Sequence, residues 1–173
     1  MFAALACNVR ALIGNCDRRL RMWQGLGFVA WCLSGILLGA WTAACLAALT
    51  VGRYIAAEWS SKKAQNTRDI VTIVFLALLM SVTALTWEGM SSLLPALAGV
   101  IATYATTQIR GASTRLALAF ASALWGVNAW AWGETCGMIV SAGAALAGCV
   151  GAWRLHHAGN APLSRQSMKD QAA

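Results

Sequence analysis

Charged residues are scarce in this chain. Only 11% of its 173 residues are charged, whereas an average soluble domain is roughly 25% charged. This shortage leaves little chain for a soluble domain, and apolar residues make up 59% of the sequence instead. They form near-continuous blocks, and a block of about 17 or more residues can cross a hydrocarbon core roughly 30 Å thick. We therefore expect a polytopic membrane protein.

Residue patterns that build catalytic or metal sites are also missing. None of the six cysteines belongs to a CxxC pair, so packing explains them better than a disulfide framework does. The histidines, His156 and His157, lie in a polar C-terminal stretch and lack the further ligands of a metal site. No predicted span has a carboxylate at its middle, and we find no nucleophile–base pair or phosphate loop. We expect no enzyme activity, no catalytic residue, no metal and no cofactor.

Seven helices are predicted. A short first helix in residues 1–15 precedes six others at 22–38, 41–58, 69–87, 92–109, 115–132 and 136–155. The apolar block 22–57 is divided near Gly39-Ala-Trp-Thr42, because glycine and threonine favour a helix end and a new start. The opening stretch MFAALACNVRALIGN is interpreted as a short or N-terminally clipped helix. In a signal peptide, the positive charge would precede the apolar residues.

Basic connections alternate with connections that lack basic residues. The basic residues follow the first, third and fifth helices and occur in the tail: Arg18, Arg19, Arg21, Lys62, Lys63, Arg68, Arg110, Arg115, Arg154, Arg165 and Lys169. The positive-inside rule places these connections and the C-terminus in the cytoplasm, and the N-terminus in the periplasm. The net charge of +7 is therefore assigned to cytoplasmic loops and anionic headgroups of the bilayer, with no nucleic acid as partner.

An offset of 94 residues indicates an internal repeat. It aligns Arg21 with Arg115, Trp31 with Trp125, Ser34 with Asn128 and Gly39 with Gly133. The helix at 69–87 has no glycine, is expected to face lipid, and restores the orientation of the second copy. The predicted fold is therefore all-α and transmembrane, with two parallel three-helix bundles at 1–60 and 91–155. A linker loop and helix at 61–90 join them, and 156–173 is expected to be a disordered cytoplasmic tail.

Two long runs resemble the bacterial inner-membrane protein YgjV family. The run NCDRRLRMWQGLGFVAWCLSGILLGAWTAACLAALTVGRYI is similar to its first half: a basic loop, a helix ending in LLG, a turn, and a helix with an arginine, here Arg53. The run SLLPALAGVIATYATTQIRGASTRLALAFASALWGVNAWAWGE is similar to its second half. The likeness covers about residues 8–155, and it implies a multi-pass fold in the bacterial inner (plasma) membrane more than an activity.

The arrangement of three helices, a linker helix and three helices is also similar to that of SWEET and PQ-loop transporters of sugars or amino acids. In those proteins a ligand lies between the two bundles. This chain differs from them, because its two prolines, Pro95 and Pro162, lie away from any mid-helix hinge and no PQ dipeptide occurs. That difference argues against their rocking mechanism.

Two pairs of residues are candidates for a solute site. Trp125 and Asn128 are three residues apart and share a helix face, and Trp31 and Ser34 are the matching pair. If both faces line the bundle interface, they meet near mid-membrane and suit a small neutral, sugar-like solute. Packing and interhelical hydrogen bonds explain the same residues. Arg53, one turn inside the cytoplasmic end of its helix, either snorkels to lipid headgroups or binds a ligand or counter-ion.

Two functions stay open at this point. The first is a small-solute transporter or facilitator that uses the interface between the bundles. The second is a structural or lipid-interacting membrane protein that transports nothing. A homo-oligomer is compatible with either function, and nothing in the sequence demands one.

Overall fold

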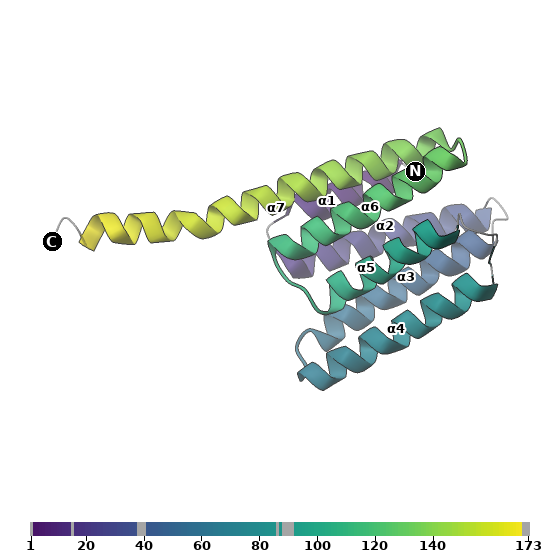
Figure 1. Ribbon diagram of the computed structural model, residues 1–173, viewed down its shortest axis with the longest axis horizontal. Helices are drawn as coiled ribbons and strands as arrows, with labels where there is room; N and C mark the ends of the chain where they lie inside the picture. Colours follow the sequence, from purple (N-terminus) through teal and green to yellow (C-terminus); the bar gives the residue numbers. More distant parts are fainter. Residues whose placement is uncertain (1, 15, 38–40, 86, 88–91, 171–173) are drawn as a thin grey trace.

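The computed structural model describes residues 2–14, 16–37, 41–85, 87 and 92–170. Within these residues the chain forms helices joined by short turns and has no strand, which confirms the all-α fold class (Figure 1). The helices are α1 (Phe2–Ile13), α2 (Asp17–Leu37), α3 (Trp41–Ser60), α4 (Gln65–Leu85), α5 (Leu93–Thr107), α6 (Ala112–Ala131) and α7 (Thr135–Asp170). The first helix is short, as expected, with 12 residues.

The helix ends differ from the predicted ends mainly at polar residues. The helix α2 begins at Asp17 and α4 begins at Gln65, each several residues earlier than predicted. Arginine and glutamine are good helix formers, and an aspartate in the first turn interacts favourably with the helix dipole. The predicted division near Gly39 falls between α2 and α3, at residues 38–40, which lie outside the described part of the chain.

The last helix is much longer than predicted. The sequence suggested a helix end near residue 155 and a disordered tail at 156–173, but α7 continues as a helix to Asp170. Figure 1 shows this helix projecting beyond the other six. Residues 163–170 include leucine, arginine, glutamine, methionine and lysine, which are good helix formers, and extending a helix is easier than nucleating a new one. Residues 156–170 are helical where we expected coil, and Pro162 lies inside this helix, where we had not expected a proline. Helix propensity explains only residues 163–170, because Gly159 and Pro162 are unfavourable in a helix interior.

The helices pack in a closed series. The helix α1 packs on α2, and α2 packs on α3; α5 packs on α6, and α6 packs on α7. Three further contacts close the series: α7 packs on α1, and α4 lies against both α5 and α3. The most extensive contacts are those of α6 with α7 and of α2 with α3.

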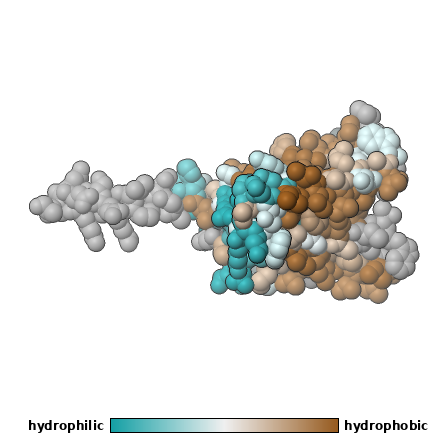
Figure 2. Space-filling model, turned by 90° about the horizontal axis from the view of Figure 1, so that it is seen from below, coloured by the Kyte–Doolittle hydropathy of each residue, from teal (hydrophilic) through white to brown (hydrophobic). Residues whose placement is uncertain are grey.

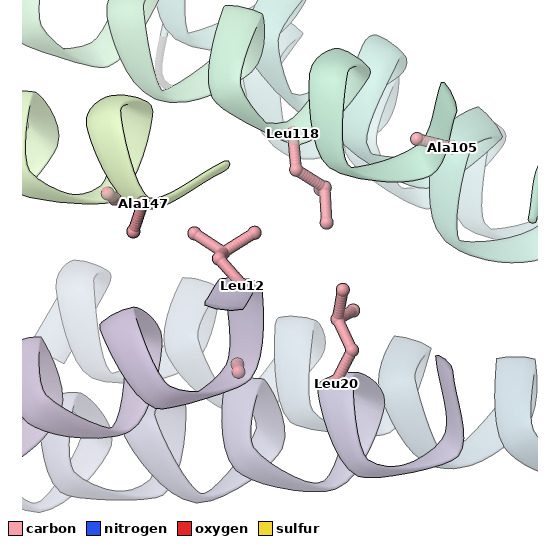
Figure 3. Close-up of a cluster of buried hydrophobic side chains, with 7 residues drawn as sticks. Leu12, Leu20, Ala105, Leu118 and Ala147 are labelled. Carbon is pink, nitrogen blue, oxygen red and sulfur yellow. The ribbon is translucent and has the colours of Figure 1, made fainter. Parts of the chain in front are cut away.

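A buried apolar cluster fills the space where five of these helices meet. Figure 3 shows Leu12 of α1 and Leu20 of α2 pointing toward Leu118 of α6. The other members of the cluster are all alanines, which let the helix backbones approach closely. The full set is Ala11, Leu12, Leu20, Ala105, Leu118, Ala144 and Ala147. Through this cluster, α1 and α2 contact α5, α6 and α7.

Large apolar side chains cover the outside of the bundle. On α4 only 6% of the most apolar window is buried, and Ile70, Ile73 and Leu85 are exposed. Figure 2 shows this apolar surface beside a hydrophilic band at the end of the bundle from which α7 projects. Large exposed apolar areas are unusual on a soluble monomer and indicate contact with lipid or protein.

Two helices in the described part of the chain are long and apolar enough to cross a membrane. They are Gln65–Leu85 and the segment Thr135–His157 of α7. The helix α5 is apolar but has 15 residues, which is shorter than a usual span. The remaining predicted spans include charged residues such as Arg53 and Arg115, and crossing of the membrane by these helices stays a prediction.

Two glycines allow α7 to approach its neighbours. A Cβ atom at Gly148 would lie 2.8 Å from Cβ of Ala119 and 2.9 Å from the backbone oxygen of Arg115. A Cβ atom at Gly151 would meet the backbone oxygen of Leu12. Backbone atoms cannot move aside as a flexible side chain can, so both positions require glycine.

Replacing Gly151 with alanine is expected to force α1 and α7 apart. The free energy of unfolding should fall by about 1–3 kcal/mol, the usual cost of overpacking, and thermal unfolding in detergent would measure the loss. Gly52→Ala is the matched control, because its Cβ atom would lie 4.0 Å from the ring of Phe75, an ordinary contact. The control should match or exceed the native stability. Equal losses in both variants would contradict this account of the α1–α7 contact.

Candidate functional site

A buried arginine connects the junction of α1 and α2 to the start of α6. The Arg115 side chain is fully buried. Its Nε and Nη2 atoms donate to the backbone oxygen of Gly14 at 3.1 and 2.6 Å. Its Nη1 atom donates to Oδ1 of Asp17 at 2.8 Å and to the backbone oxygen of Gly111 at 2.9 Å. We call Gly14, Asp17, Gly111 and Arg115 the Arg115 clamp.

The carboxylate of Asp17 takes part in the clamp with both oxygens. Its Oδ2 atom accepts a hydrogen bond from the backbone N–H of Gly111 at 2.9 Å. Partial burial raises the pKa of Asp17, but the hydrogen bonds from Arg115 and Gly111, with the charges of Arg115 and Arg21, outweigh burial. The pKa of Asp17 therefore lies below its usual value. A depressed carboxyl pKa stabilises the fold above the usual pKa, and that stability is lost as the pH falls through the depressed value.

The other basic connections lie at the same end of the bundle. Arg68 donates to the backbone oxygens of Thr107 and Gln108 at 2.7 and 2.9 Å, which joins α4 to the end of α5. Arg110 donates to the backbone oxygen of Ser61 at 2.9 Å, between the α5–α6 and α3–α4 junctions. The junctions after α1, α3 and α5 are thus held together, and we call this the basic end.

A cluster of polar side chains lies inside the bundle, about two turns from the basic end. Arg53 of α3 is only 8% exposed, and its Nη1 atom donates to Oγ1 of Thr103 on α5 at 3.1 Å. Its guanidinium carbon lies 5.1 Å from the ring centre of Tyr54. The Tyr54 hydroxyl in turn donates to Oε1 of Gln24 on α2 at 3.4 Å. We call Gln24, Arg53, Tyr54 and Thr103 the Arg53 cluster.

The position of Arg53 corrects the interpretation that it snorkels to lipid headgroups. The side chain turns inward between α3 and α5, because the Thr103 hydroxyl and the ring of Tyr54 receive the guanidinium there. The contact of Arg53 with a ligand or counter-ion stays a prediction.

Trp31 and Ser34 lie on α2, and Trp125 and Asn128 lie on α6. Trp125 is 45% exposed and Trp31 is half-buried. Asn128 lies in the last turn of α6, nearer to the helix end than the predicted mid-membrane position. Its Oδ1 atom is buried and has no hydrogen-bond partner among the described residues. Ser34 belongs to α2, but its side chain lies outside the described part of the structure.

The helices that carry these two pairs of residues, α2 and α6, do not pack extensively on each other. The helix α2 packs on α1 and α3, whereas α6 packs on α5 and α7. Convergence of Trp31 and Ser34 with Trp125 and Asn128 therefore stays a prediction. No three histidine, cysteine or carboxylate side chains among the described residues gather as metal ligands.

Sequence reasoning missed three members of the Arg53 cluster. Gln24 carried a usable signal, because it is the one amide in the apolar block 22–57. Thr103 gave none, since its role depends on α5 lying against α3, and 50 residues separate it from Arg53. Tyr54 is the neighbour of Arg53 in the sequence, but its contact with Gln24 again requires the packing of two helices.

Comparison with known proteins identifies one family. A family model described as a bacterial inner membrane protein, Imp-YgjV, matches residues 1–158. This range includes the Arg115 clamp, the Arg53 cluster and the candidate residues on α2 and α6. No curated protein and no solved structure matches the chain.

The Arg115 clamp should make the stability of the protein sensitive to acid. In the native protein, thermal stability should fall as the pH drops below the usual carboxyl range and Asp17 becomes protonated. The variant Asp17→Asn should be less stable near neutral pH and should lose part of this acid dependence. Asp69→Asn is the control, because Asp69 accepts hydrogen bonds from the neutral amides of Gln65 and Gln108. An unchanged acid profile in Asp17→Asn would count against the clamp.

Proposed function

Because the chain belongs to the Imp-YgjV family of bacterial inner membrane proteins, we propose that it transports a small solute between its two sets of helices. The observation that carries this proposal is the Oδ1 atom of Asn128, which is buried without a partner in the described residues. Leaving such a group unpaired costs about 1–3 kcal/mol. A packing role for Asn128 does not offset this loss of free energy. A solute held against Trp125 and Asn128 would supply the missing hydrogen bond.

The packing order of the helices supports the proposed architecture. The first set packs in the order α1, α2, α3, and the second set packs in the order α5, α6, α7. In both sets the first helix ends at the basic end. The helix α4 lies against α5 and α3, as a linker helix between two parallel three-helix bundles would. This is the arrangement in which SWEET-like transporters place a ligand at the interface of the bundles.

The packing at the basic end supports a solute path between the two sets of helices that is closed at this end. The apolar cluster around Leu12, Leu20 and Leu118 fills the space between the two sets, and the Arg115 clamp holds their junctions together. By the positive-inside rule this closed end faces the cytoplasm. Trp31 and Trp125 lie roughly 20 Å along their helices from it, so the solute would enter from the periplasm.

Uptake into proteoliposomes tests the transport function. The purified protein should take up at least one solute from a panel of sugars, amino acids and nucleosides. Trp125→Ala and Asn128→Ala should each slow that uptake roughly tenfold, because each removes a contact worth about 1–2 kcal/mol. Trp130→Ala is the matched control on the same helix, since Trp130 is 70% exposed, and it should transport normally.

Two results would contradict the transport function. One is the absence of uptake for every solute on the panel. The other is an uptake that Trp125→Ala and Asn128→Ala leave unchanged. Either result would favour the alternative, a structural or lipid-interacting membrane protein that transports nothing.

The orientation in the membrane has a separate test. A reporter fused after Ala173 should be active in the cytoplasm, and a reporter fused before Met1 should be active in the periplasm, because the basic connections are held inside. Enzyme reporters that work on only one side of the inner membrane would measure this. A periplasmic C-terminus would reverse the orientation and with it the side from which the solute enters.

A further inference from the structure

Arg53 differs from the other arginines that the structure describes inside the bundle. Arg115 donates to one carboxylate and two backbone oxygens. Arg21 donates to Oε2 of Glu58 at 2.8 Å, and Arg68 donates to backbone oxygens at the end of α5. Among the described residues, the groups that interact with Arg53 are neutral: Oγ1 of Thr103, to which it donates, and the side chain of Tyr54. The charge of Arg53 is therefore the least compensated of the four.

The remaining donors of Arg53 support this comparison. A guanidinium carries five N–H donors, and its Nε atom is buried without a hydrogen-bond partner among the described residues. The Thr103 hydroxyl donates its own proton to the backbone oxygen of Gly99 at 2.7 Å, so toward Arg53 it is an acceptor. Within the described residues, no carboxylate forms an ion pair with Arg53.

The acidic residues near the basic end are already engaged elsewhere. Asp17 is bound to Arg115 and Gly111, and Glu58 is bound to Arg21. Asp69 accepts hydrogen bonds from two glutamine amides. A charge that is nine-tenths buried without a counter-charge is unfavourable. None of these three carboxylates serves as the counter-charge of Arg53.

We propose that Arg53 binds the oxyanion group, carboxylate or phosphate, of a small molecule inside the bundle. The planar guanidinium presents parallel N–H donors that match the two oxygens of such a group. Thr103 holds one end of the guanidinium, and the ring of Tyr54 lies against it. The site is polar on the α2 side as well, where Gln24 accepts from the Tyr54 hydroxyl.

As a substrate site, this inference rests on the proposed transport function and narrows it from neutral solutes to anionic ones. Arg53 lies seven residues before the end of α3 at Ser60, which is roughly 10 Å from the basic end. An anion that enters between the helix sets would reach Arg53 before the cytoplasmic side. A phospholipid phosphate would offer the same chemistry from outside the bundle.

Ligand-dependent thermal stability tests the proposal without any transport step. The full chain is placed in nanodiscs of zwitterionic lipid and melted with increasing acetate, benzoate or inorganic phosphate, and with glucose as the neutral probe. The native protein should be stabilised by at least one anion in a saturable manner, and glucose should not reproduce the effect. In Arg53→Gln the apparent dissociation constant should rise roughly ten- to hundredfold, because charge-assisted hydrogen bonds are lost.

Two further variants keep the test decisive. Arg53→Lys retains a positive charge but loses the planar fork, so it should fold and still bind the anion severalfold more weakly than the native protein. Arg68→Gln is the matched control, because it removes an arginine from the same end that binds backbone oxygens. This control should keep the native anion response. An equal response of the native protein, Arg53→Lys and Arg53→Gln would overturn the proposal.

A second set of nanodiscs that contain anionic lipid distinguishes the two sources of the oxyanion. If anionic lipid and a soluble anion compete for the protein, and the competition is lost in Arg53→Gln, both ligands bind at Arg53 and the proposal is supported. If only anionic lipid stabilises the protein through Arg53 and no soluble anion does, the proposal that Arg53 binds an anionic solute is overturned. Binding that depends on Arg53 without any uptake would show that the site exists and the transport function fails. Uptake of neutral solutes alone, with no anion response, would leave transport and reject this site.

Discussion

The buried guanidinium of Arg115 is the interaction on which the arrangement of the helices depends. A charged group taken out of water is tolerated only when its donors are used and its charge is balanced. Arg115 meets this requirement with Asp17 and with the backbone oxygens of Gly14 and Gly111. Those partners belong to the α1–α2 junction and to the turn before α6, so the need to balance one charge fixes three helices against each other.

The last helix completes this arrangement through close backbone contact. At Gly151 a Cβ atom would meet Leu12 of α1 and approach the Arg115 side chain at 3.2 Å. Small residues suit such contacts in lipid, where apolar side chains gain nothing by leaving the membrane for the protein interior. The inner faces are therefore rich in alanine and glycine, while the bulky Ile, Leu and Met side chains of α4 are exposed on the outside.

The two deeply buried arginines illustrate two different uses of charge. Arg115 is surrounded by acceptors that belong to the protein, and it acts as a structural connection between junctions. Arg53 has one hydroxyl, one aromatic ring and an unpaired Nε atom in the described structure. Fully satisfied polar networks stabilise a fold, whereas an ionisable side chain inside a membrane protein without a counter-charge is a candidate functional site.

The sequence alone determined the helices, the family and the end at which the basic residues gather. Apolar block length and charge alternation are local properties, so α2 to α6 lie within a few residues of their predicted bounds and the junctions after α1, α3 and α5 meet at one end. Local properties did not reveal which side chains become partners. Arg115 and Asp17 are 98 residues apart, and Arg53 and Thr103 are 50 apart. Only the packing of the helices decided that one arginine is neutralised and that the other turns inward without a counter-charge.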